Sequence, residues 1–303
     1  MGNVDPIKYI VNLDYIDQYT DMAKEAWILN GGTDAPTGEL AKEQRQWDIA
    51  VVSATQEQLI QEAPDATTRA RLLAVSAPDA GAWLSAPPLT AAGLRMDDET
   101  VRIATGLRLG TALCAPHTCH CGAVVDARGL HGLSCQKSAG RFMRHSQLND
   151  IIHRALIRAN VPSAKEPQGL IVGSGLRPDG VSLIPWSHGK CLAWDATVPD
   201  TLAPSHVSAT STHTGSAAAH ASSVKLQKYS SLQASHHVVP VAIETLGPWN
   251  VEGRSFVAEL GRRISAVTGD LRETAFLRQR LSVAVQKGNA ISCLGSLRRD
   301  DDS

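Results

Sequence analysis

Apolar residues recur at helical spacing through most of the first part of the chain. The pattern predicts one helix over residues 5–29, two more between residues 47 and 75 that Pro64 separates, and a fourth from Asp97 to Gly110. An aspartate can begin such a helix, because its carboxylate accepts hydrogen bonds from the free N–H groups of the first turn. We therefore expect residues 1–110 to form a helical region.

The pattern changes beyond residue 137. Apolar residues from Phe142 to Ala159 follow the 3.6-residue period, which predicts a helix from Ser138 to Asn160 that ends before Pro162. Apolar runs between turn residues predict the remaining elements, which are strands at 169–173, 177–184 and 190–198, a helix at 216–234, a strand at 237–245 and two closing helices. The order is α-β-β-β-α-β, so the predicted fold class is α+β, with residues 137–303 as one domain.

Length and composition describe a globular protein without a strong overall charge. The chain has 303 residues, of which 43% are hydrophobic, and this is enough for a sizeable core. Its 29 Lys and Arg against 30 Asp and Glu leave a net charge of −1. Any contact with nucleic acid would therefore have to be local.

No segment is suited to a membrane or to secretion. The longest apolar runs, such as residues 238–243, are far shorter than the roughly 18 residues that a bilayer requires. Residues 1–19 mix charged residues with apolar ones and lack the basic start of a signal peptide. We therefore expect no membrane association and an intracellular location, in the nucleus or the cytoplasm.

Cysteine and histidine residues gather in one short stretch. Cys119-x-Cys121 supplies one pair of ligands, and His131 with Cys135 supplies a second pair, as in small tetrahedral zinc sites. The sequence predicts a structural zinc knuckle at residues 111–136, because four protein ligands leave no open position for water. The alternative is a group of thiols without a metal. The C-x-C gap is tighter than usual, and four neighbours could substitute as ligands, namely Cys114, His117, His120 and His145.

Two aspartates fall on consecutive predicted strands. Asp179 begins one strand, in Arg177-Pro178-Asp179-Gly180, and Asp195 lies inside the next, in an otherwise apolar run. A hairpin would bring these carboxylates together, and a buried carboxylate requires a partner such as a cation. Phosphodiester hydrolysis uses such a pair to hold Mg²⁺, and Glu166 is the candidate for a third ligand.

A lysine that positions the attacking water usually stands two residues after the second acid of such a site. Thr197 occupies that position here. Lys225 and Lys228 lie one turn apart on the following predicted helix, so either could face the sheet. The simpler alternative is a solvent-exposed lysine pair beside an ordinary Pro-Asp-Gly turn.

The motifs together resemble a known family. They are similar to the zinc knuckle and restriction-like endonuclease at the C-terminus of site-specific non-LTR retrotransposon proteins, which belongs to the PD-(D/E)xK nuclease superfamily. That superfamily has an α-β-β-β-α-β core, and its retroelement branch carries the lysine on the helix. Residues 261–264 and 279–284 also resemble retroelement-derived sequences. The resemblance rests on the order Cys119-x-Cys121, His131, Cys135, Arg144-His145, Arg177-Pro178-Asp179, Asp195 and Lys225-x-x-Lys228-Tyr229.

The resemblance implies roles for particular residues. Asp179 and Asp195 would bind Mg²⁺, Lys225 or Lys228 would position water, and Tyr229 would support the helix. Zn²⁺ would bind the knuckle as a structural ion. Nucleic acid would contact four residues, Arg141, Arg144, His145 and Arg177. A local strip of cations adds to them, formed by Lys137, Arg141, Arg144, Arg154, Arg158 and Lys165.

The same family places a reverse transcriptase before the nuclease. Residues 1–110 would then be a remnant of the segment that links polymerase to endonuclease, and the chain would be a fragment. The principal hypothesis is a Mg²⁺-dependent endonuclease acting on DNA, with element RNA as a second candidate partner. A catalytically inert, zinc-containing module that binds nucleic acid is the alternative, and a scaffold with no partner is the third. A Ser/His/Asp hydrolase is disfavoured, because the serines and histidines of residues 205–220 lack a nucleophile elbow.

Overall fold

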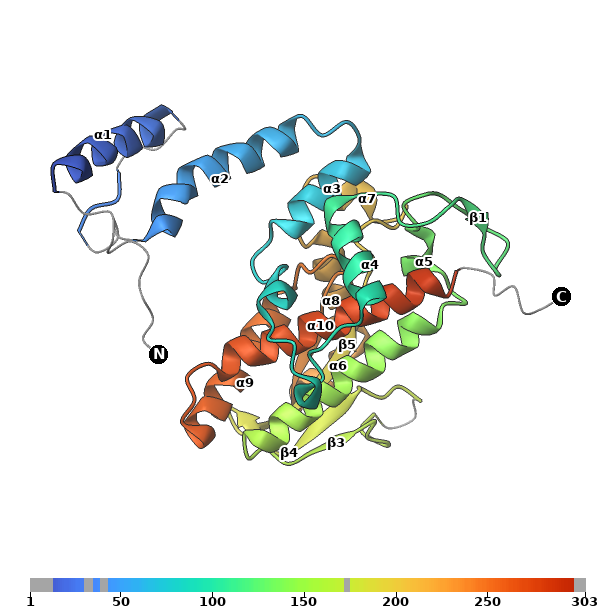
Figure 1. The fold of residues 1–303 in the computed structure, drawn as a ribbon. Coiled ribbons are helices and arrows are strands. Elements are labelled where there is room, and N and C mark those ends of the chain that lie inside the picture. The colour runs from blue at the N-terminus through green and yellow to red at the C-terminus, as the bar shows by residue number, and fades with distance from the viewer. Residues whose placement is uncertain (1–12, 30–34, 39–42, 172–174, 297–303) are drawn as a thin grey trace. The chain divides into compact units, whose positions relative to one another are not determined.

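A computed structural model describes residues 13–29, 35–38, 43–171 and 175–296. The chain divides into two compact units, residues 1–63 and 64–303 (Figure 1). The sequence predicted a boundary at residue 110 instead. No helix in the described ranges is long and apolar enough to cross a membrane.

The first unit contains two helices, α1 (Leu13–Leu29) and α2 (Gln44–Gln61). Trp27 of α1 meets Trp47 of α2 edge to face, with ring centroids 6.3 Å apart. The helix predicted at 5–29 is confirmed from residue 13 onward, and its first residues lie outside the described ranges.

The second unit begins with two capped helices, α3 (Ala66–Val75) and α4 (Asp98–Leu109). The predicted cap at Asp97 is confirmed, because its carboxylate accepts a 2.7 Å hydrogen bond from the Thr100 N–H. Two 3-10 turns, η3 (Ala82–Ser85) and η4 (Thr90–Ala92), lie between these helices. Helix α4 and turn η3 pack against the C-terminal helix α10 (Glu273–Leu294). Apolar residues of α3 share a buried cluster with α4 and α10. Ala92 of η4 packs against the cluster that includes Val283 of α10. Residues 64–110 therefore belong to the same compact unit as the sheet.

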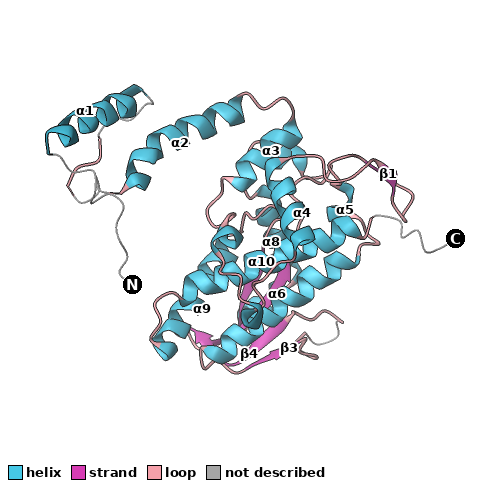
Figure 2. Cartoon of the chain, viewed as in Figure 1, coloured by secondary structure: helices cyan, strands magenta, loops and turns pink. Residues whose placement is uncertain are grey.

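A four-stranded sheet lies at the centre of this unit (Figure 2). Its order is β3-β4-β5-β6, in which β3 to β5 are antiparallel and β5 pairs in parallel with β6. A parallel pair requires a crossover, which runs through the short helix α7 (Val207–Thr210), helix α8 (Ser216–Lys228) and the turn η5 (Ser230–Ala234). The strands are β3 (Ser163–Lys165), β4 (Gly180–Ser187), β5 (Lys190–Thr197) and β6 (His236–Ala242).

The strand predicted at residues 169–173 is wrong over residues 169–171, which form a bend, and residues 172–173 lie outside the described ranges. Gly169 has a φ of +76°, a conformation that does not continue a strand. Residues 163–165 pair with β4 in its place. The predicted α-β-β-β-α-β order is nevertheless confirmed, starting from helix α6 (Ala139–Arg158).

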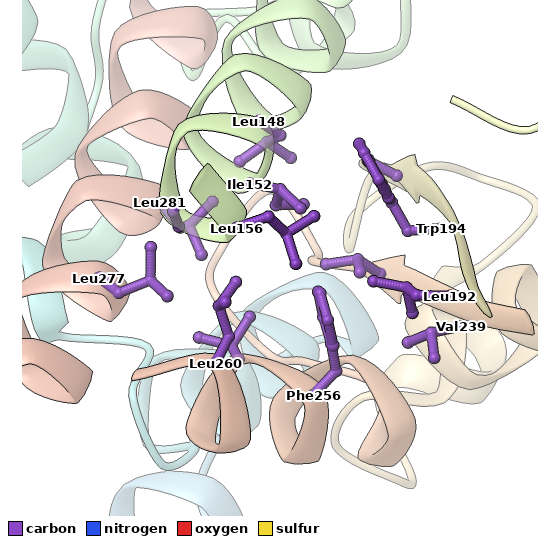
Figure 3. Close-up of a cluster of buried hydrophobic side chains, with 14 of the residues drawn as sticks. Leu148, Ile152, Leu156, Leu192, Trp194, Val239, Phe256, Leu260, Leu277 and Leu281 are labelled. Atoms are coloured by element: carbon purple, nitrogen blue, oxygen red, sulfur yellow. The ribbon is translucent and has the colours of Figure 1, made fainter. Parts of the chain in front are cut away.

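The main core lies between one face of the sheet and three helices, α6, α9 (Val251–Thr268) and α10. Figure 3 shows side chains from all three helices converging on Leu192, Trp194 and Val239. Because side chains alternate along a strand, Asp195 points away from the face that carries Trp194. The chain is therefore a mixed α+β protein in which both faces of β5 are buried.

Helices α6 and α10 approach closely, because glycines stand at their contact. A Cβ atom on Gly140 of α6 would lie 2.2 Å from the Ser292 hydroxyl oxygen. A Cβ atom on Gly288 of α10 would lie 2.0 Å from Cγ of Arg144. Both distances are far below a normal contact, so the glycines set the spacing that Arg144 fills.

Candidate functional site

The Cys and His residues of the predicted knuckle come together around one point. A hairpin of β1 (His117–Thr118) and β2 (Val124–Val125) carries Cys119 and Cys121 at its turn. The Cys119 N–H donates to the Ala123 carbonyl at 2.9 Å, and Gly122 has a φ of +91°, which only a residue without a Cβ adopts readily.

The short helix α5 (His131–Ser134) supplies the second pair of donors. Cys121 Sγ lies 3.1 Å from His131 Nε2, and Cys119 Sγ lies 3.8 Å from Cys135 Sγ. All four donor atoms lie within 4.8 Å of one another. Three sulfurs and one imidazole nitrogen form a donor set that could hold a metal ion such as zinc.

The four alternative ligands lie outside this set. Cys114 Sγ donates to the Asp126 carbonyl, and His117 Nε2 contacts the Ser296 carbonyl oxygen at 3.1 Å. His145 lies beside Asp179 instead. In the part of the chain that the structure describes, no second group of three or more Cys, His or carboxylate donors gathers this closely.

Asp195 is the centre of a second cluster. It is 2% exposed. One of its two carboxylate oxygens contacts a residue of α8, and the other contacts the residue that follows α8. Lys225 Nζ lies 2.5 Å from Oδ1, and the Tyr229 hydroxyl donates to Oδ2 at 2.6 Å. Burial and the charge of Asp179 raise the pKa of Asp195, against the opposing effect of Lys225.

Asp179 immediately precedes β4 and lies beside Asp195 of the neighbouring strand β5, since Gly180 pairs with Trp194. Its Oδ2 accepts a 2.7 Å hydrogen bond from the Ala196 N–H and lies 3.0 Å from His145 Nε2. Burial acts to raise the pKa of Asp179, but hydrogen bonds from His145 and Ala196 outweigh it and hold the pKa below its usual range. The hydrogen bond to Asp179 raises the pKa of His145 in turn.

Gly180 makes this arrangement possible. A Cβ atom at this position would lie 2.0 Å from Cζ2 of Trp194, so only glycine fits beneath the indole ring. The Pro178-Asp179-Gly180 sequence is therefore more than an ordinary turn, because Gly180 packs against buried Trp194 and the Asp179 carboxylate lies within hydrogen-bonding distance of Ala196 N–H.

The structure separates the two candidate lysines. Lys225 contacts the carboxylate of Asp195, whereas Lys228 is exposed and its ammonium lies 4.7 Å from the centre of the Tyr229 ring. Tyr229 is fully buried, and its hydroxyl also lies 2.6 Å from the Arg177 carbonyl oxygen. It therefore joins the end of α8 to β5 and to the segment that leads into β4, in agreement with a supporting role.

Glu166 does not join the two aspartates. Its exposed carboxylate pairs with Arg177 at 3.2 Å, and its backbone N–H donates to the Asp179 carbonyl at 2.8 Å. We expected Glu166 to provide a third metal ligand. In the described residues, its carboxylate does not gather with those of Asp179 and Asp195 into such a group.

The nucleic-acid role predicted for Arg144 is wrong, because the residue is 1% exposed. Its guanidinium donates to Asn289 Oδ1, the Ser292 hydroxyl and the Leu133 carbonyl, at 3.0–3.1 Å. Burial lowers its pKa to about 10. Arg144 therefore ties α6 to α5 and α10 and is unavailable to a phosphate. Arg141, His145 and Arg177 are exposed.

Asn149 is the residue that the sequence interpretation missed. It is 7% exposed, its Oδ1 accepts from Trp194 Nε1 at 3.2 Å, and its amide nitrogen lies 3.4 Å from the His145 ring. Its position four residues after His145 was the available signal, because residues at that spacing share one face of a helix.

A scan against protein-family models and a search of curated proteins found no match to this chain.

Proposed function

We propose that residues 137–303 form a restriction-endonuclease-like domain that hydrolyses phosphodiester bonds of DNA with the aid of Mg²⁺. One observation carries the proposal. Asp179, at the start of β4, and Asp195 of the neighbouring strand β5 lie at a site that Lys225 reaches from the crossover helix. The α-β-β-β-α-β order and the motif resemblance support the same assignment.

The donor set fits the ion. Mg²⁺ prefers oxygen ligands and is commonly held by one or two carboxylates together with substrate phosphates, so two aspartates suffice. When bound, it would supply Lewis-acid chemistry to the scissile phosphate. In this scheme Tyr229 fixes the orientation of the Asp195 carboxylate, and Asn149 restrains the ring of His145 next to Asp179.

Lys225 is the residue that would orient the attacking water. Its ammonium is partly exposed and can donate further hydrogen bonds while it contacts Asp195. His145 is nearly half exposed on the other side of Asp179 and could contact a phosphate oxygen. We assign Zn²⁺ at the knuckle a structural role, because all four donors come from the protein.

Nicking of supercoiled plasmid by purified, zinc-loaded protein with Mg²⁺ tests the proposal. We expect Asp195→Asn to slow nicking on the order of 10³-fold, because it removes a charge that acts at the reacting phosphate. Asp270→Asn is a matched control, since Asp270 pairs with Arg272 near the start of α10 and away from this site.

A folded wild-type protein that binds DNA and does not nick it with Mg²⁺ would overturn the enzymatic assignment. The inert nucleic-acid-binding module would then be the better account. Circular dichroism and zinc content, measured on every variant, separate loss of chemistry from loss of fold.

A further inference from the structure

A pocket of about 310 Å³ lies between α6, α10 and the segment that follows η4. These elements pack side by side in Figure 1. Three cations line the pocket, which are Arg154 of α6 and Arg280 and Lys287 of α10. The apolar part of its lining includes Leu94, Ile151 and Ala284.

The charges of this pocket are unbalanced. Asp150 is the one acid among its lining residues, and its carboxylate is already paired with Lys165 at 2.5 Å. Lys287 Nζ donates to the Gly93 carbonyl at 2.8 Å, which leaves two of its three N–H groups for a ligand. The pocket therefore presents an excess of positive charge.

Arg280 is the residue that most requires a partner. Its side chain is half-buried and makes no hydrogen bond or ion pair within the described ranges, although a guanidinium carries five N–H donors. Burial and the nearby charge of Arg158 lower its pKa, and Glu273 opposes them only in part. The carboxylate of Glu273 is already bound to Arg158 at 2.5 Å. An anion in the pocket would offset this cost.

The pocket is distinct from the carboxylate site. Successive helical residues turn by about 100°, so Gln147 and Arg154 project from the side of α6 opposite to His145 and Asn149. The ligand of the pocket is therefore separate from the groups that Asp179 and Asp195 would hold, and the inference does not rest on the nuclease proposal.

We propose that this pocket binds a phosphate group through Arg154, Arg280 and Lys287. A phosphate matches the planar donors of two arginines and the point charge of a lysine, and its oxygens accept several charge-assisted hydrogen bonds. The phosphate can belong to a polynucleotide backbone or to a free phosphate or nucleotide. The adjoining pocket shares Gln147 and Lys287 with the first, but the acidic residues Asp97 and Asp98 also line it. We therefore expect the phosphate to bind in the first pocket and not in the second.

Binding measurements on the full chain, loaded with zinc, test this assignment. Isothermal titration calorimetry with inorganic phosphate and with adenosine 5′-monophosphate addresses the free ligands, and fluorescence anisotropy with a DNA duplex and an RNA oligonucleotide addresses the backbone. Arg280→Gln should weaken binding at least about tenfold in one of these arms, because it removes charge-assisted hydrogen bonds. Arg262→Gln is the matched control, since Arg262 is exposed on α9 and paired with Glu259.

The outcomes separate the two sources. Loss of free-phosphate or nucleotide binding alone identifies a small ligand, and loss of oligonucleotide binding alone identifies a backbone phosphate. Equal affinities of Arg280→Gln and Arg262→Gln in every arm would overturn the proposal, as would a wild-type protein that binds none of the probes. Lys287→Gln provides a second variant if Arg280→Gln fails to fold by circular dichroism.

Discussion

The Cys and His cluster and the aspartate cluster are held together in opposite ways. Four donor atoms of the knuckle lie within 4.8 Å of one another. Asp195, in contrast, has a lysine ammonium at 2.5 Å and a tyrosine hydroxyl at 2.6 Å. The protein itself therefore balances the charge of the aspartate, whereas the knuckle concentrates groups that bind metal best as thiolates and would then repel one another.

Because of this difference, the two clusters give different evidence for a bound metal ion. Converging thiolates repel one another unless a cation lies between them, so the geometry of the four donors suits a metal ion. A buried carboxylate that contacts a lysine ammonium and a tyrosine hydroxyl has its charge balanced without one. The assignment of Mg²⁺ to the aspartates therefore depends on measured chemistry, and the assignment of a metal to the knuckle depends on measured binding.

Removal of the metal from the knuckle should have the largest effect. We expect Cys135→Ser to lose bound zinc and to lower the free energy of unfolding by at least about 4 kcal/mol, a fraction of the metal-binding free energy of structural zinc sites. The buried Cys135 is one of the four converging donors, whereas the half-buried Cys191 in β5 is not, so Cys191→Ser is the control. Zinc content and thermal unfolding of both variants make the measurement. Wild-type stability and zinc content in Cys135→Ser would show that the cluster is a group of thiols without a metal.

The gathering of the four Cys and His donors could be predicted from sequence because they are local. Two close pairs separated by a short loop can meet whatever the rest of the chain does, and the tight C-x-C gap fits the hairpin turn at Gly122. The cap of α4 at Asp97 was predicted for the same reason, since it depends on a residue three positions away.

The burial of Arg144 could not be predicted from sequence, because the prediction placed only apolar residues in the core. The buried positions at the start of α6 are Gly140, Arg144 and Leu148, spaced by four, whereas Phe142 is 78% exposed. The apolar residue thus lies on the surface and the charged residue in the core. The partners that make this possible, Asn289 and Ser292, stand more than 140 positions later in the sequence.

The choice between Lys225 and Lys228 also required the fold. Both belong to the last turn of α8, and their spacing of three residues leaves either free to face the sheet. The parallel pairing of β5 with β6 sets the direction of the crossover, and only then does Lys225 reach Asp195. Long-range strand pairing of this kind has no local sequence signal.

Replacement of Arg144 should have the next largest effect, because this residue joins α6 to the knuckle helix α5 and to α10. Arg144→Met removes donors to Leu133 next to the knuckle and to Asn289 and Ser292 of α10. We expect the free energy of unfolding in urea to fall by about 3 kcal/mol, since three buried acceptors lose their partner. Zinc content should stay at the wild-type level, because no ligand is changed.

Arg141→Met is the control for this change. Arg141 is exposed on the same helix, so its replacement should alter stability by less than about 0.5 kcal/mol. Equal stabilities of the two variants would contradict a structural role for Arg144. Loss of zinc from Arg144→Met alone would show that the knuckle depends on the sheet unit for its geometry.

The smallest loss of stability is expected from replacing Lys225, the residue that balances the charge of Asp195. Lys225→Met leaves the buried Asp195 with Tyr229 as its remaining partner, and the free energy of unfolding without divalent cation should fall by about 2 kcal/mol. The partial exposure of Lys225 keeps this value below that of a fully buried pair. Lys228→Met should change it by less than about 0.5 kcal/mol, because the Lys228 ammonium is solvated and only its contact with the Tyr229 ring is lost.

Urea unfolding with and without Mg²⁺ then tests whether a metal ion can replace the Lys225 ammonium in balancing the charge of the aspartates. If Asp179 and Asp195 bind Mg²⁺, the ion should restore part of the stability lost in Lys225→Met and leave Lys228→Met unchanged, because only the first variant has an uncompensated carboxylate pair. A Lys225→Met protein that is destabilised and gains nothing from Mg²⁺ would mean that the aspartates are a lysine-bound structural pair. Equal destabilisation by both substitutions would instead contradict the ion pair between Lys225 and Asp195 on which the comparison rests.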